Sequence, residues 1–127
     1  AFHLSLGLNY PNKADKILNQ NNRLGGDIFI HGDCVSIGCI PITNDGIEEL
    51  YLLALMAKTS GQELIDVHLF PFRMDSLNLS KLVDRCSNKK MKLFWTNLSE
   101  GYLYFEEHKM VPKIRVNQNG YYLIDLL

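Results

Sequence analysis

The stretch IHGDCVSIGC, which runs from Ile30 to Cys39, decides how the fold of the whole chain is interpreted. The mostly apolar run 27–30 predicts a short buried strand that delivers His31 at its end. Gly38 and the small or polar residues around it then allow a loop that folds Cys39 back beside His31. A strand end and a tight loop are therefore expected to bring a thiol and an imidazole together.

A thiol beside an imidazole is typical of nucleophilic catalysis. The thiolate is the nucleophile, and a free cysteine with a pKa of about 8.5 is mostly protonated at neutral pH. A neighbouring imidazole takes that proton and later returns it to a leaving amine. Gly38 lets the backbone turn so that N–H groups point at the oxygen of a tetrahedral intermediate, and each donor lowers the barrier by roughly 3–4 kcal/mol. The pattern predicts Cys39 as an acyl-transfer nucleophile and His31 as its general base.

Length and composition indicate one soluble globular domain. The chain has 127 residues, of which 46% are hydrophobic and 21% charged, which is ordinary for such a domain. A net charge of -1 gives no support to a nucleic-acid surface or a polybasic membrane anchor. No apolar run approaches the roughly 18 residues of a membrane-spanning helix. The chain begins at Ala1 inside a strand-like pattern, and we interpret it as trimmed at the N-terminus.

The hydrophobic periodicity predicts an α+β fold. Asp45 and Glu48 resemble a capping box that opens a helix, and Gly61 ends it. Two further helices are expected near 79–86 and 91–102. Alternating residues predict strands at 2–6 and 67–69 and a C-terminal hairpin, 114–116 with 121–124, around an Asn119–Gly120 turn.

A His-Gly pair at a strand end, followed by Ser-x-Gly-Cys, resembles the catalytic motif of the L,D-transpeptidase (YkuD-type) domain. The block IHGDCVSIGC with the helix start GIEE at 46–49 is most similar to the YafK subgroup, and so are VHLFPFR at 67–73 and the segment 94–102. The resemblance covers most of the chain. It implies an L,D-transpeptidase-like β-sandwich or sheet core with several helices packed on it, as a single catalytic domain over residues 1–127.

The resemblance also implies roles for individual residues. Cys39 matches the nucleophile and His31 the base. Gly32 matches the position whose backbone carbonyl orients that histidine, while Gly38 and Cys39 match the donors of the oxyanion hole. No metal or other cofactor is implied.

Ser36 matches the serine of the motif, as a loop-shaping residue and a candidate substrate contact. Arg73 is a second candidate contact, for a substrate carboxylate, although a solvated surface arginine is the ordinary interpretation. The sequence departs from the family at two places, because Ile37 replaces a frequent histidine and Pro41 replaces a frequent arginine. The loop between His31 and Ser36 is also shorter than in most members.

The substrate implied by the resemblance is a peptidoglycan stem peptide, cut next to diaminopimelate through a thioester on Cys39. Transfer of the acyl group to an amine makes an L,D-transpeptidase, and transfer to water makes a murein endopeptidase or amidase of the same fold. The YafK subgroup includes an enzyme that releases a lipoprotein from peptidoglycan, so a murein-linked lipoprotein is a candidate partner. The expected location is the periplasm or cell envelope, with no nucleic-acid partner.

Two other classes of function stay open. His31, Cys34 and Cys39, joined by His68 or His108, supply ligands that suit zinc, although their spacing matches no common zinc finger. A non-catalytic module that binds cell-wall peptides in the same groove is the other alternative.

The remaining cysteines and the aromatic residues have mainly structural interpretations. Three cysteines are too few, and odd in number, for a disulfide framework. Cys34 is expected to pack, with a reversible disulfide to Cys39 as the alternative, and Cys86 is expected in the core. The aromatic residues of one predicted helix are expected to pack rather than to form a sugar-stacking platform; they are Phe94, Trp95 and Tyr102.

Overall fold

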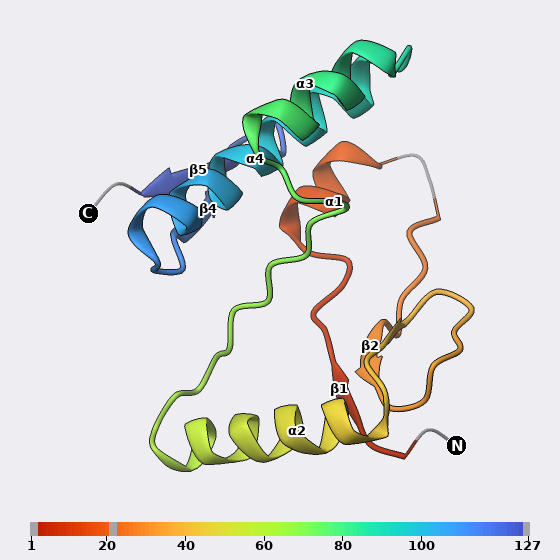
Figure 1. Cartoon of the computed structure of the whole chain (residues 1–127), viewed down its shortest axis with the longest axis vertical. Helices are drawn as coiled ribbons and strands as arrows, with labels where there is room; N and C mark the ends of the chain where they lie inside the picture. Colours follow the sequence, from red (N-terminus) through yellow and green to blue (C-terminus); the bar gives the residue numbers. More distant parts are fainter. Residues whose placement is uncertain (1–2, 21–22, 126–127) are drawn as a thin grey trace.

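The computed structural model describes residues 3–20 and 23–125 of the chain. This part is α+β, as predicted, and contains four helices and five short strands (Figure 1). No helix among these residues is long and apolar enough to cross a membrane. In chain order the elements are β1 Ser5–Gly7, α1 Lys13–Leu18, β2 Phe29–His31, β3 Ile40–Pro41, α2 Asn44–Thr59, α3 Ser76–Arg85, α4 Lys89–His108, β4 Lys113–Val116 and β5 Tyr122–Asp125.

A three-stranded sheet in the order β1-β2-β3 carries the two ends of the cysteine loop. β1 runs antiparallel to β2, and β2 runs parallel to β3 with Ile30 opposite Ile40 and His31 opposite Pro41. Parallel neighbours usually need a connection of a dozen or more residues. Here residues 32–39 alone connect them, so the loop must turn sharply. Pro41 has no N–H to donate, which suits the edge position of β3.

Helix α2 begins directly after this sheet and is anchored at its first turns. The side chain of Thr43 caps it by accepting a hydrogen bond from the N–H of Gly46 at 3.3 Å. The predicted capping box of Asp45 and Glu48 is therefore wrong, because the helix starts two residues earlier. Ile47, in the first turns, is completely buried.

The outer part of α2 has little cover within the described chain. Its sequence is apolar on every side from Leu50 to Ala57, and four residues there are more than half exposed: Leu52 58%, Leu53 56%, Leu55 54% and Met56 57%. Figure 1 shows the helix extending away from the sheet, with an extended segment leading back from its end.

The other helices and the hairpin form a second group of elements (Figure 1). α4 packs against α3 and β5, and the side chain of Asn97 bonds both the N–H and the carbonyl of Tyr122 on β5, each at 2.8 Å. Trp95 and Tyr102 of α4 make edge-to-face contacts with Phe72 and Phe70, with ring centroids 5.5 and 5.4 Å apart. These two aromatic residues therefore pack, as expected, and fasten the end of the extended segment to α4.

One predicted strand is wrong. The segment 62–70 is extended but pairs with no strand in the part of the chain that the structure describes. Alternation of Val67 and Leu69 with His68 is compatible with a strand, yet a strand also needs a hydrogen-bonded neighbour. At the N-terminus the strand begins at Ser5 rather than at residue 2, and Phe2 lies outside the described residues. The predicted hairpin is present, with a connection of residues 117–121.

Candidate active site

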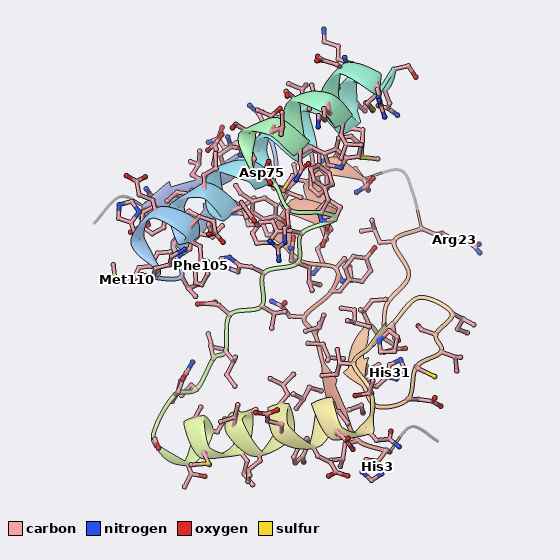
Figure 2. All side chains as sticks on the ribbon, in the orientation of Figure 1. His3, Arg23, His31, Asp75, Phe105 and Met110 are labelled. Atoms are coloured by element: carbon pink, nitrogen blue, oxygen red, sulfur yellow. The ribbon has the colours of Figure 1, made fainter. Side chains whose placement is uncertain are left out.

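His31 is the last residue of β2 and is completely buried. It lies between Ser5 of β1 and Pro41 of β3, and Figure 2 shows it within the small sheet, next to the start of α2. Its Nδ1 donates a hydrogen bond to the carbonyl oxygen of Gly32. Because a carbonyl oxygen only accepts, this contact selects the tautomer with the proton on Nδ1 and makes Nε2 the basic nitrogen of the neutral ring.

Gly32 occupies a place that has no room for a side chain. A Cβ added to it would lie 2.6 Å from Oδ1 of Asn44 and 3.1 Å from Cγ2 of Ile47. Its N–H donates to the carbonyl of Leu4 at 3.1 Å, which continues the contact with the chain at β1. The glycine after the histidine is thus explained by a close approach of the backbone to α2.

Hydrogen bonds close the two ends of the cysteine loop against each other; we call this closure the neck. The N–H of Ile42 donates to the carbonyl of His31, and that of Thr43 to the carbonyl of Asp33, both at 2.9 Å. The N–H of Asp33 donates to Oδ1 of Asn44 at 2.8 Å. Asp33 and Thr43 both have left-handed backbone, with φ of 70° and 69°. Such values are uncommon for residues other than glycine, and for a β-branched threonine they indicate strain.

Within the loop, Ser36 holds the turn that precedes the cysteine. Its Oγ accepts from the N–H of Gly38 and donates to the carbonyl of Cys39, both at 2.9 Å. Gly38 has a φ of 146°, which side-chain-bearing residues rarely adopt. The glycine of the motif is therefore required by its backbone angle.

Cys39 is partly buried and directly precedes β3. Pro41, two residues after Cys39, pairs with His31, so the strand that follows the cysteine runs beside the end of β2. In the structure the thiol donates to the carbonyl of Asp27 at 3.6 Å. The thiol is thus bonded to the chain just before the start of β2.

The other candidate residues lie elsewhere or are exposed. Cys34 is exposed on the loop, and all three cysteines are free thiols. Arg73 is exposed beside the buried Met74, in the segment that leads into α3. Cys86 caps the end of α3, where its thiol donates to the carbonyl of Asn88 at 3.6 Å.

The two histidines considered as zinc ligands have other neighbours. His108 stacks on Tyr104 with ring centroids 4.2 Å apart, and His68 lies edge-on to Phe70. Among the residues that the structure describes, no three histidine, cysteine or acidic side chains gather closely enough to hold a metal ion.

Asn44 is the site residue that the sequence analysis missed. It contacts the backbone of the loop through its Oδ1, both at the N–H of Asp33 and near Gly32. An asparagine at the start of a predicted helix is a recognisable local signal, but it points to capping of its own helix. Its approach to the loop depends on how α2 meets the sheet, which the sequence pattern does not reveal.

Comparison with known proteins finds curated relatives of this chain. No family model matches the chain. The chain is 35% identical over 123 residues, 97% of its length, to the protein named "Putative L,D-transpeptidase YafK" in two strains of Escherichia coli. The resemblance to YafK-like L,D-transpeptidases is confirmed. The chain spans 47%, about half, of the length of these curated relatives. The match covers 97% of this chain and therefore includes the whole cysteine loop.

Proposed function

We propose that this YafK-like chain carries the catalytic centre of a cysteine acyl-transfer enzyme that acts on peptidoglycan stem peptides as an L,D-transpeptidase. The observation that supports it is the placement of His31, whose Nδ1 donates to the Gly32 carbonyl and which pairs across the sheet with Pro41, two residues after Cys39. The similarity to the YafK proteins adds the reaction class and the substrate class. A β-sandwich core and a location in the cell envelope belong to the same proposal.

The first half of the reaction forms a thioester. The Cys39 thiol exchanges the Asp27 carbonyl for Nε2 of His31 and gives up its proton there. The thiolate then attacks the carbonyl carbon of a stem-peptide bond next to diaminopimelate. When the tetrahedral intermediate collapses, the carbon–nitrogen bond breaks and the imidazolium returns the proton to the leaving amine. The acyl group remains on Cys39 as a thioester.

The second half transfers that acyl group. An acceptor amine gives a proton to Nε2 of His31 as its nitrogen attacks the thioester carbon. The carbon–sulfur bond then breaks, and the proton on His31 restores the Cys39 thiol. The products are a new peptide bond and the free enzyme.

The N–H groups of Gly38 and Cys39 are the proposed donors to the negative oxygen of each tetrahedral intermediate. In the free protein the Gly38 N–H donates to Oγ of Ser36, so the substrate oxygen replaces that hydroxyl. Each such donor lowers the barrier by roughly 3–4 kcal/mol. Ser36 then keeps its bond to the Cys39 carbonyl and continues to shape the turn.

The proposal is tested by intact-mass spectrometry of the full-length protein mixed with stem peptides. We expect a thioester adduct on the wild-type protein and its loss in Cys39→Ala, with turnover falling at least about 10³-fold. Cys86→Ala is the matched control, because that thiol caps α3 away from the cysteine loop and should leave the adduct intact. Absence of any adduct with murein substrates, or an adduct that survives Cys39→Ala, refutes the proposal.

The acyl acceptor is identified by chromatography of sacculi digested before and after treatment with the enzyme. New crosslinked dimers support transpeptidation. Shortened stems or a released lipoprotein would replace the transpeptidase assignment with the murein endopeptidase or amidase alternative. Binding to sacculi without any product, unchanged in Cys39→Ser, would indicate a non-catalytic cell-wall-binding module.

A further inference from the structure

The peptide unit that joins Gly32 to Asp33 is hydrogen-bonded at both of its ends. Its carbonyl accepts from Nδ1 of His31, and its N–H donates to Oδ1 of Asn44 at 2.8 Å. In a trans peptide these two groups point in opposite directions across one rigid plane. Asn44 and His31 therefore hold the same plane from opposite sides, and turning it breaks both bonds together.

The observed orientation of this plane is unfavourable for Asp33. The φ of Asp33 is 70°, a left-handed value that most side-chain-bearing residues avoid and that aspartate adopts at a modest cost. Rotating the plane by half a turn would bring this φ to about −110°, which is ordinary extended backbone. Gly32 offers little resistance to the accompanying change in its own ψ, because it has no Cβ. Loss of the bond to Asn44 therefore removes one of the two restraints on the plane, and a turned plane carries the carbonyl away from His31.

Asn44 is well placed to act as that partner. It is the first residue of α2, whose start is fixed by the Thr43 cap and by the completely buried Ile47. Its Oδ1 also lies within 2.6 Å of the position that a Cβ on Gly32 would take, so the side chain fits closely against the loop backbone. A side chain mounted on an anchored helix turn holds a loop group more firmly than another loop residue can.

We propose that Asn44 is a positioning residue of the candidate active site. By accepting the Asp33 N–H it keeps the Gly32 carbonyl on Nδ1 of His31, and so keeps the imidazole in the tautomer whose Nε2 receives a proton. The catalytic consequence rests on the proposed function, in which that proton comes from Cys39. The effect on the tautomer of His31 does not depend on any substrate.

The direct test is ¹⁵N NMR of the His31 side chain in the full-length protein. The wild-type protein should show the neutral ring with its proton on Nδ1. Asn44→Ala removes the acceptor, so we expect a mixture of tautomers. Asn44→Asp retains an oxygen at the same place, next to a helix N-terminus that favours negative charge, and should preserve the wild-type spectrum. Asp45→Ala, in the same helix turn, is the control for a general effect on α2.

Reactivity gives a second measurement that needs no murein substrate. The rate at which iodoacetamide alkylates Cys39 should fall about 10- to 100-fold in Asn44→Ala, and its pH dependence should change, because a misplaced base removes the proton poorly. The rate in Asn44→Asp should stay within about threefold of wild type. In the enzyme assay, kcat should follow the alkylation rate while KM stays constant.

The outcomes separate this inference from the proposed function. An unchanged tautomer and unchanged alkylation in a folded Asn44→Ala protein overturn the positioning role. A changed tautomer in an enzyme that makes no murein product leaves that role standing and refutes the proposed function alone. If circular dichroism shows that Asn44→Ala does not fold, Asn44→Gln replaces it, because glutamine moves the acceptor by one methylene. Identical spectra of the Gln and Asp variants would then overturn the inference.

Discussion

The neck of the cysteine loop and the outer part of α2 are neighbours in sequence, yet they are held in different ways. The neck is built from hydrogen bonds between backbone groups and Asn44, around the buried His31 and Gly32. The outer part of α2 is much more apolar, but Leu52, Leu53, Leu55 and Met56 are more than half exposed. The comparison teaches that polar contacts and one buried anchor, Ile47, fix the geometry of this site, whereas the amount of apolar sequence in the helix does not. The site depends on the first turns of α2 and hardly at all on the rest of the helix.

The largest effect on stability should come from Ile47→Ala in the full-length protein. Ile47 is completely buried beneath Gly32, and truncation of such a side chain costs about 2–5 kcal/mol of unfolding free energy. Leu53→Ala is the matched change in the outer part of the same helix, and we expect less than about 1 kcal/mol there, since Leu53 is 56% exposed. Urea unfolding of both variants measures the difference. Equal losses of unfolding free energy in the two variants would contradict the view that the first turns of α2 are anchored and its outer part is not.

Gly32→Ala should have the next largest effect. The added methyl would meet Oδ1 of Asn44 and Cγ2 of Ile47 at distances shorter than ordinary contacts, which costs about 1–3 kcal/mol. Because the clash falls on the peptide that contacts His31, activity should fall further than stability does. Thermal unfolding and the acyl-enzyme assay check this on the same samples. Gly26→Ala is the control, since a Cβ there meets nothing within 4 Å, and wild-type-like activity in Gly32→Ala would contradict the close approach.

The smallest effect on stability should come from substitutions of Thr43, and its direction should differ between glycine and alanine. Thr43→Gly relieves the left-handed strain while losing only a few tenths of a kcal/mol from the helix cap, so stability should rise by about 0.5–1 kcal/mol. Thr43→Ala keeps the strain and loses the cap, so stability should fall by about 1 kcal/mol. Denaturation midpoints distinguish the two. A loss of stability in both variants would show that the φ of Thr43 is not a source of strain.

Much of the fold follows from periodicity and turn chemistry. The structure contains the predicted helices near 79–86 and 91–102 and the C-terminal hairpin. An apolar stripe favours a helix and an alternating pattern favours a strand when another element packs on the apolar side. The strand predicted at 67–69 is wrong because an alternating pattern shows which residues suit a strand. It does not show whether another strand is available to form hydrogen bonds with it. The helix start after the sheet was misplaced because the sequence does not reveal the left-handed backbone of Thr43.

The candidate site was predictable only in its chemical groups. His31 and Cys39 stand out because their residue types and the glycines around them suit one reaction class. The role of Asn44 was not predictable, because its Oδ1 meets the Asp33 N–H only after α2 has docked on the sheet.

The neck has a consequence for how freely the tip of the cysteine loop can change in length and sequence. Its hydrogen bonds close the loop from His31 to Thr43 without using the exposed Val35, which is 64% exposed, or the side chain of Ile37 at the surface. Lengthening a loop whose ends are already joined costs little, about 0.6 kcal/mol for each doubling. Residues between Cys34 and Ser36 can therefore be inserted or exchanged while the histidine stays in place. The tip of the loop can therefore change in length and sequence while its hydrogen-bonded ends keep the same geometry.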